Sequence, residues 1–255
     1  MTSAILYHAN EGGLQQANPL TKLALTAAVL VAAATLRSLP LLLAVFLAVL
    51  VPLAWWSRAL GPFLRTCLRL IWPFALSLAL VQGFFAPGST RLFAVGPLAM
   101  KSEGLVIASI FTARLLLGLG AATLLMLTTR PDTLMLALVQ KGLPRQIAYV
   151  VVTALQIIPS FQAKAQAILD AQRSRGLETE GGVGRRVRAL VPLIGPLILG
   201  SLMALEERAI ALEARAFMRP GPRTSLRTVP DSRVQSWIRW VLLAAMIGLV
   251  VWRVL

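Results

Sequence analysis

Two short sequences each place an arginine between two small residues, at the end of a long helix-favouring segment. They are Ser174-Arg175-Gly176 and Ala214-Arg215-Ala216. An arginine in such a position reaches far from the backbone and can hold a carboxylate through two parallel hydrogen bonds. The rest of the chain has a membrane-like composition. The pattern therefore indicates a membrane protein whose arginine-tipped helices bind a soluble partner.

The alternative for both arginines is an ordinary interfacial role, in which the side chain extends to lipid phosphates. Residues 128–235 hold fifteen of the 25 Lys and Arg residues, so basic side chains are common there. Nearby charged residues form either a second layer of partner contacts or a solvated face with pairs worth about 0.3–0.5 kcal/mol each. These possible supporting residues are Arg173, Glu206, Arg208 and Glu213.

The composition excludes an ordinary water-soluble domain. The 255 residues are 57% hydrophobic and 14% charged, whereas a soluble domain has about a quarter charged residues. The net charge of +15 in so apolar a chain indicates cytoplasmic loops and anionic lipid, and we expect no nucleic-acid partner. Cys67 and His8 are the only cysteine and histidine, so we expect no internal disulfide and no zinc or copper site. The polar start through Asn18 lacks the pattern of a cleavable signal.

Apolar segments of membrane-spanning length predict the fold class. We expect an all-α integral membrane protein with about five transmembrane helices and long coupling helices on the cytoplasmic side. The predicted parts are 1–127 with four spans, 128–235 with the coupling helices, and 236–255 as the last span. The expected spans are Leu20–Leu36, Leu41–Trp56, Leu70–Phe85, Gly104–Leu127 and Ser236–Leu255. A basic connector, Ser57–Arg69, and a turn-rich loop, Ala86–Glu103, complete the membrane part.

The predicted cytoplasmic region consists of one short and two long segments. They are Pro131–Gln140, Arg145–Ser174 and Arg185–Arg219, with a flexible turn at Gly176–Gly184. Prolines inside the long segments are expected to bend them. An apolar stripe at helical spacing on the second segment is suited to packing on another helix; it comprises Leu202, Leu205, Ala209, Leu212 and Ala216.

The distribution of basic residues predicts the orientation. If residues 128–235 are cytoplasmic, alternation places the connector with Arg58, Arg65 and Arg69 on the same side. The amino terminus is then inside and the carboxyl terminus outside. Arg114 lies within the fourth expected span, where a charge is costly and no carboxylate is available in the other spans. It either has a function or faces the protein interior.

Five motifs, in order, resemble those of one family, and the resemblance covers nearly the whole chain. Asn18-Pro19-Leu20-Thr21-Lys22-Leu23 resembles an Asp/Asn-Pro-x-x-Lys-Leu entry to the first span. The others are Arg130-Pro131-Asp132, Gly142-Leu143-Pro144, Ala171-Gln172-Arg173-Ser174-Arg175-Gly176 and Glu213-Ala214-Arg215-Ala216-Phe217. Together they resemble the transmembrane T component of energy-coupling-factor (ECF) transporters, which import vitamins and transition-metal ions.

The resemblance implies a coupling subunit of the bacterial or archaeal cytoplasmic membrane. It implies two ABC-type ATPase subunits that receive the arginine tips, and a small substrate-binding membrane subunit, the S component. The expected docking residues are Ser174, Arg175, Gly176, Ala214, Arg215 and Ala216. The chain contains no Gly-Lys pair and hence no phosphate-binding Gly-Lys-Ser/Thr loop. We therefore expect no enzyme activity, catalytic residue or cofactor in this chain, with ATP and magnesium bound by the partners.

One position departs from the family pattern: Ala216 stands where the second signature usually has glycine. Alanine favours a continued, stiffer helix by roughly 1 kcal/mol relative to glycine. Two other classes of protein stay open at this point. One is an ABC-type permease with its own pathway, although polar residues are scarce in the spans. The other is a membrane enzyme of lipid metabolism, although clustered acid–base residues are lacking. The substrate itself is not specified by this sequence.

Overall fold

The computed structural model of the chain describes residues 17–87, 90–95, 98–177, 182–219, 221 and 228–254. The chain divides into two compact units, which are described separately. Unit 1 comprises residues 1–142 and 228–255, and unit 2 comprises residues 143–227. The predicted division at residues 128 and 235 concerns placement in the membrane, which these units do not test, and it stays a prediction.

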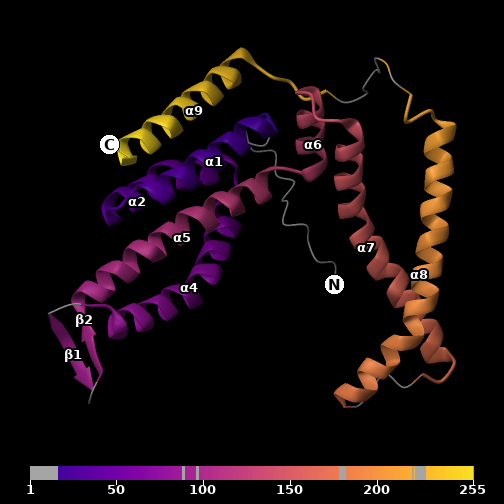
Figure 1. The fold of residues 1–255 in the computed structure, drawn as a ribbon, viewed down its shortest axis with the longest axis horizontal. Helices are drawn as coiled ribbons and strands as arrows, with labels where there is room; N and C mark the ends of the chain where they lie inside the picture. The colour runs from indigo at the N-terminus through magenta and orange to yellow at the C-terminus, as the bar shows by residue number, and fades with distance from the viewer. Residues whose placement is uncertain are drawn as a thin grey trace. The chain divides into compact units, whose positions relative to one another are not determined.

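Unit 1 is mainly helical, with one short hairpin. Its helices are α1 (Pro19–Thr35), α2 (Leu39–Val45), η1 (Phe46–Leu50), α3 (Val51–Trp56), α4 (Leu60–Phe85), α5 (Ser102–Thr128), α6 (Pro131–Gln140) and α9 (Arg233–Val254). Its strands are β1 (Arg91–Val95) and β2 (Leu98–Lys101). Figure 1 shows α1 between α5 and α9, with α4 on the other side of α5 and the hairpin at the far end of α4 and α5.

The second apolar segment forms one continuous helix with a π-helical turn, η1, in its middle. Val51 donates its amide to the carbonyl of Phe46, five residues earlier. The following residue, Pro52, has no amide hydrogen and crowds the turn before it, which favours such local widening. The Phe46 ring stacks on Phe63 of α4 with 6.1 Å between centroids. The wide turn therefore contributes to the packing of the membrane unit.

Glycines on α5 let neighbouring helices approach closely. A Cβ atom on Gly104 would lie 2.1 Å from the backbone oxygen of Gln82 on α4, a distance that no side chain can accept. A Cβ atom on Gly120 would lie 3.1 Å from Leu50 and 3.3 Å from Phe46. Helices in a membrane pack closely where small residues lie at their crossing points, because burial of apolar side chains from lipid does not by itself favour contact between helices. Leu42, Leu50, Phe63, Leu117 and Leu127 are fully buried around this crossing.

The fold class predicted from sequence is confirmed: the chain is an all-α membrane protein. In the described part of the chain, five helical segments are long and apolar enough to cross a membrane: Leu39–Trp56, α4, α5, α7 (Arg145–Ser174) and Arg233–Arg253. The first expected span, Leu20–Leu36, corresponds to α1, a shorter apolar helix of 17 residues. Large apolar side chains on the outer faces of α4 and α9 are exposed, among them Trp72, Phe85, Trp237, Trp240 and Trp252. Lipid covers such faces in a membrane protein.

Two sequence expectations in this unit need correction. Ser57–Arg69 is not a connector, because α4 already begins at Leu60. Arg65 and Arg69 are exposed, so long arginine stems keep their charges in polar surroundings without ending the helix. The loop Ala86–Glu103 contains the antiparallel pair β1–β2, in which Ala94 faces Ala99. Two strands this short carry too little alternating pattern to be recognised beside strong turn signals.

Unit 2 consists of two long helices, α7 (Arg145–Ser174) and α8 (Val183–Ala214). Both helices continue through their internal prolines, Pro159 in α7 and Pro192 and Pro196 in α8. An internal proline removes one backbone hydrogen bond and bends the helix, and Figure 1 shows both helices changing direction along their length. The second helix ends at Ala214, five residues before the end of the predicted segment Arg185–Arg219.

Candidate functional site: two arginine-tipped helix ends

The carboxyl end of α7 is closed by a Schellman motif, a pair of backbone hydrogen bonds that follows the last helical turn. Leu177 donates its amide to the Gln172 carbonyl at 3.0 Å, and Gly176 donates to the Arg173 carbonyl at 2.9 Å. Gly176 takes a left-handed conformation with φ of +90°, which glycine adopts without steric cost. Arg175 is the capping residue, so its side chain leaves the helix where the backbone turns away from the helix axis.

The carboxyl end of α8 has the same geometry. Phe217 donates its amide to the Leu212 carbonyl at 3.0 Å, and Ala216 donates to the Glu213 carbonyl at 2.8 Å. Arg215 is the capping residue, with backbone angles within 5° of those of Arg175. The two predicted arginines therefore occupy equivalent positions in equivalent helix ends.

The expected continuation of α8 through Ala216 is wrong. The helix ends at Ala214, and Ala216 takes a left-handed conformation with φ of +52°. A residue with a Cβ atom loses roughly 1–2 kcal/mol in that conformation. The two closing hydrogen bonds oppose this cost, and so does the packing of the Phe217 ring on Tyr149, with 5.1 Å between centroids. Local helix propensity is thus overruled by the cap and by a contact distant in sequence.

The structure places the two arginine tips at opposite ends of the α7–α8 pair. Phe217 follows the end of α8 directly, and its ring contacts Tyr149 in the second turn of α7. Arg175 lies at the other end of α7, and about 25 residues at 1.5 Å each correspond to roughly 40 Å along the helix. Figure 1 shows α7 and α8 running in opposite directions. The tips therefore lie at two separate places in unit 2.

All six predicted docking residues are exposed, in both the Ser174–Gly176 and the Ala214–Ala216 motif. In the part of the chain that the structure describes, neither Arg175 nor Arg215 has an ion-pair partner. Each guanidinium can therefore donate two hydrogen bonds to a carboxylate of another molecule. Their position at a helix carboxyl end also suits a cation, because the helix dipole is negative there.

The predicted supporting residues lie on the same two helices and are exposed. Arg173 pairs with Asp170 at 3.6 Å, and both side chains are about half exposed (48% and 58%), so this pair contributes little. Glu206, Arg208 and Glu213 are on α8. Among the described residues no group of three or more His, Cys, Asp or Glu side chains is placed to hold a metal ion. The site offers binding groups and no acid–base or metal constellation.

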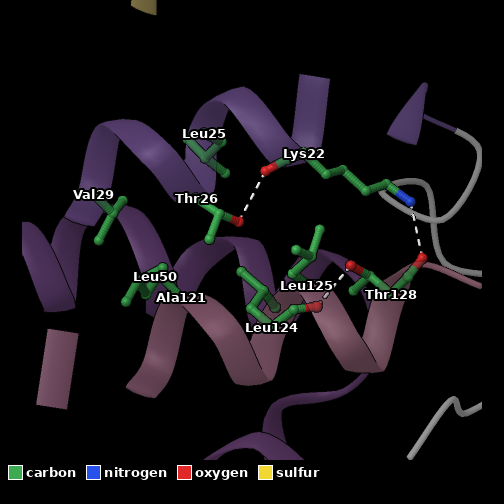
Figure 2. Close-up of a pocket in the computed structure, with 9 residues that line it drawn as sticks. All are labelled: Lys22, Leu25, Thr26, Val29, Leu50, Ala121, Leu124, Leu125 and Thr128. Atoms are coloured by element: carbon green, nitrogen blue, oxygen red, sulfur yellow. Dashed lines mark hydrogen bonds between the residues drawn. The ribbon is translucent and has the colours of Figure 1, made fainter. Parts of the chain in front are cut away.

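The motif that begins at Asn18 ties three parts of unit 1 together. The Asn18 side chain accepts a hydrogen bond from the Leu20 amide at 2.9 Å and so caps α1. The Lys22 ammonium is buried and donates to the Thr128 carbonyl at the end of α5, at 2.9 Å, as Figure 2 shows. The Asn18 amide donates to the side chain of Gln235 on α9. These contacts give the motif a structural role that the sequence did not disclose.

Arg114 also contacts a helix end. Its guanidinium donates to the Leu36 carbonyl, at the end of α1, at 2.9 Å. Arg253 of α9 donates to the carbonyls of Ala34 and Thr35 in the same turn. The sequence suggested that Arg114 needs a carboxylate partner, but its partner is a backbone carbonyl. This carbonyl lies at the end of α1, where no amide of the helix can donate to it. Arg114 thus faces the protein interior, as the structural alternative predicted.

The sequence contained no indication of an ion-pair cluster around Asp231. Asp231, just before α9, accepts two hydrogen bonds from Arg239, both 2.9 Å long, and pairs with Lys141 at 2.9 Å. The Arg239 and Lys141 hydrogen bonds lower the pKa of Asp231 to about 2. Asp231 and Arg239 are eight residues apart, which gave no local signal because the chain is extended before α9 begins.

The fold and this site define a helical integral membrane protein with an exposed arginine at the carboxyl end of each of two long helices. A family profile described as Cobalt transport protein (CbiQ) matches residues 13–226. Three similar curated proteins are all described as energy-coupling factor transporter transmembrane protein EcfT. That of Heliobacterium modesticaldum is 34% identical over 202 residues, covering 76% of this chain and 72% of the relative. That of Listeria innocua is 31% identical over 199 residues, covering 74% of each.

The third relative, from Leuconostoc gelidum subsp. gasicomitatum, is 32% identical over 181 residues, which cover 68% of this chain and 66% of the relative. The chain therefore spans about two thirds to three quarters of the length of the relatives it matches. Because the family profile covers most of the chain, the chain belongs to the family of transmembrane T components of energy-coupling factor transporters. The resemblance found in the five motifs is thereby confirmed.

Proposed function

We propose that this protein couples ATP hydrolysis by two ATPase subunits to uptake of a substrate held by a separate membrane subunit. In this proposal Arg175 and Arg215 each enter an acidic groove on one ATPase. ATP binding then draws the ATPases together and moves both helix ends. The chain itself contributes no catalysis, and ATP with magnesium is bound by the partners.

The observation that carries the proposal is the pair of matching helix ends. Arg175 and Arg215 are exposed, have no acidic partner among the described residues and cap the carboxyl ends of α7 and α8 with the same geometry. The two carboxyl ends lie at opposite ends of the α7–α8 pair. A pair of like subunits presents two like grooves, and two like tips suit them. A bidentate arginine–carboxylate contact that is buried on docking costs about 3–5 kcal/mol to break, because one charge is left without a partner. Such contacts can transmit force.

The substrate is proposed to be a vitamin or a transition-metal ion bound by a small S component. The described part of this chain lacks a metal-ligand cluster, and the matching family is described as a cobalt transport protein, so recognition by a partner accommodates both facts. The proposed location is a bacterial or archaeal cytoplasmic membrane. The distribution of basic residues supports an amino terminus inside and a carboxyl terminus outside.

The proposal is tested by ATP-driven uptake into vesicles that contain this chain, candidate ABC-type ATPases and a substrate-binding subunit. Arg175→Glu and Arg215→Glu place a negative charge opposite the expected carboxylates. We expect each single change to weaken ATPase co-purification and the double change to abolish both co-purification and uptake. Arg175→Lys and Arg215→Lys keep the charge without the two-pronged geometry and should give intermediate losses.

Arg37→Glu is the matched control, because Arg37 is an exposed arginine between α1 and α2 and the charge change is identical. The double variant must remain in the membrane, which helical circular dichroism and membrane fractionation check. Normal assembly and uptake in the double variant would return both arginines to a role at the lipid surface. Uptake without any substrate-binding subunit would favour a permease with its own pathway.

A further inference from the structure

The cluster formed by Lys141, Asp231 and Arg239, here called the Asp231 cluster, has a distinctive place in the chain. Unit 1 is made of two segments, and the chain leaves it after Gly142 and returns at Thr228. Lys141 immediately precedes the exit, and Asp231 lies three residues after the return. The ion pair between them, at 2.9 Å, therefore joins the two points through which unit 2 is attached.

The cluster is also fixed to the membrane-embedded helices of unit 1. Arg239, on the second turn of α9, holds Asp231 through two bonds of 2.9 Å and also contacts the Thr21 hydroxyl of α1 at 3.3 Å. The Arg239 side chain is 15% exposed and that of Asp231 25%, whereas that of Lys141 is 56% exposed. The bidentate pair is thus the strong part of the cluster, and the Lys141 pair is the weaker, more screened part.

We infer that the Asp231 cluster is a mechanical anchor that holds both connections of unit 2 to unit 1 while force passes between them. The inference rests on the proposed function, because it supposes that movement of α7 and α8 must reach the membrane helices. If either connection could slide, part of that movement would be lost in the linking segments. Asp231 is then a positioning residue for energy coupling, with no contact to substrate or ATP.

The experiment measures two quantities on the assembled complex in vesicles: substrate taken up per ATP hydrolysed, and amide hydrogen exchange in residues 228–238. Asp231→Asn keeps the size of the side chain and removes its charge. We expect the uptake per ATP to fall by about tenfold, since both charge-assisted contacts are lost. ATPase co-purification should stay at the parent level, because the arginine tips are unchanged. Exchange in residues 228–238 should become faster.

The geometry of the cluster predicts the order in which further variants reduce the uptake per ATP. Arg239→Lys keeps the charge but loses one of the two bonds to Asp231, so we expect a smaller loss of coupling, about threefold. Lys141→Gln removes the exposed partner and should cost less than about twofold. Glu207→Gln is the control, since it neutralises an exposed acid on α8 that belongs to neither arginine motif. Asp231→Glu, which keeps the charge, should recover much of the parent coupling.

The outcomes separate this inference from the proposed function. The anchor role is wrong if the Asp231→Asn and Arg239→Lys proteins both take up as much substrate per ATP as the parent. It is also wrong if amide exchange in residues 228–238 does not change, even where uptake works. If the parent complex shows no ATP-driven uptake, the proposed function fails, and unchanged coupling is then meaningless. The exchange measurement still decides whether the cluster holds the two connections. Should Asp231→Asn fail to enter the membrane, Arg239→Lys and Lys141→Gln carry the same test.

Discussion

Three basic residues of unit 1 and the arginines at the ends of α7 and α8 differ in what they contact. In unit 1, Lys22, Arg114 and Arg253 donate to backbone carbonyls at the ends of α5 and α1. At the helix ends of unit 2, Arg175 and Arg215 are exposed and have no ion-pair partner in the described part of the chain. The same type of side chain therefore closes the membrane unit in one region and stays available for binding in the other.

The comparison shows what decides the role of a cation in an apolar chain. The last carbonyls of a helix have no donor within the helix, and in a membrane no water can supply one. A buried lysine or arginine that reaches such a carbonyl satisfies it and lowers its own cost of burial. A cation at a helix end exposed to water meets no such demand. Its contribution to stability is small, and its guanidinium remains accessible to another molecule.

The largest effect is expected for a cation of the first kind. Lys22→Met keeps most of the side-chain volume but leaves the Thr128 carbonyl without this donor. We expect a loss of stability of about 1–3 kcal/mol, the usual cost of a buried polar group that loses its partner. Thermal unfolding of the protein in detergent, followed by circular dichroism, measures the effect.

Lys164→Met is the matched control for this change, because Lys164 is exposed on α7. Its unfolding temperature should equal that of the parent. A stable Lys22→Met protein would mean that removing the buried ammonium compensates fully for the lost hydrogen bond, and the assigned role of Lys22 in closing unit 1 would be wrong.

Two opposite substitutions, one at each helix end of unit 2, should have effects of intermediate size on stability. Ala216→Gly should stabilise the end of α8 by about 1 kcal/mol, because glycine takes the left-handed conformation without the penalty of a Cβ atom. Gly176→Ala should destabilise the end of α7 by a similar amount; no other atom lies within 4 Å of the added Cβ, so the cost is that of the backbone alone. Hydrogen exchange of residues 172–177 and 212–217 measures both. Equal exchange in all three proteins would contradict the left-handed assignment of Ala216.

The smallest effect on stability is expected at the tips themselves. Arg175→Gln and Arg215→Gln should change the free energy of unfolding by less than about 0.5 kcal/mol, as exposed substitutions usually do. Their effect on ATPase binding should be large by comparison. A pull-down with the ATPases and a thermal unfolding experiment on the same preparations compare the two. A strong loss of stability in either variant would place that arginine with the structural cations of unit 1.

Much of the fold and of the site followed from local patterns in the sequence. Long apolar runs predicted four of the five candidate membrane spans, the exception being α7, which was expected on the cytoplasmic side. The pattern of arginine between small residues singled out Arg175 and Arg215, although the second long segment was expected to continue to Arg219. Other features were not predictable in this way. The start of α4 at Leu60 was obscured by Arg65 and Arg69, whose long stems let charges coexist with a continuous helix. The β1–β2 pair was obscured by its short length.

The sequence by itself determined the class of protein, because the amount and spacing of apolar residues can be satisfied only by helices in a membrane. It also singled out Arg175 and Arg215, because each lies between two small residues near the end of a helix-favouring segment. Only the tertiary structure decided the partners of Lys22, Arg114 and Asp231, which lie up to 106 residues away in the chain. It also decided the left-handed turn at Ala216, where a cap and a ring contact with Tyr149 outweigh the local preference of alanine for helix. Such contacts depend on which segments meet in space, and no local pattern records that.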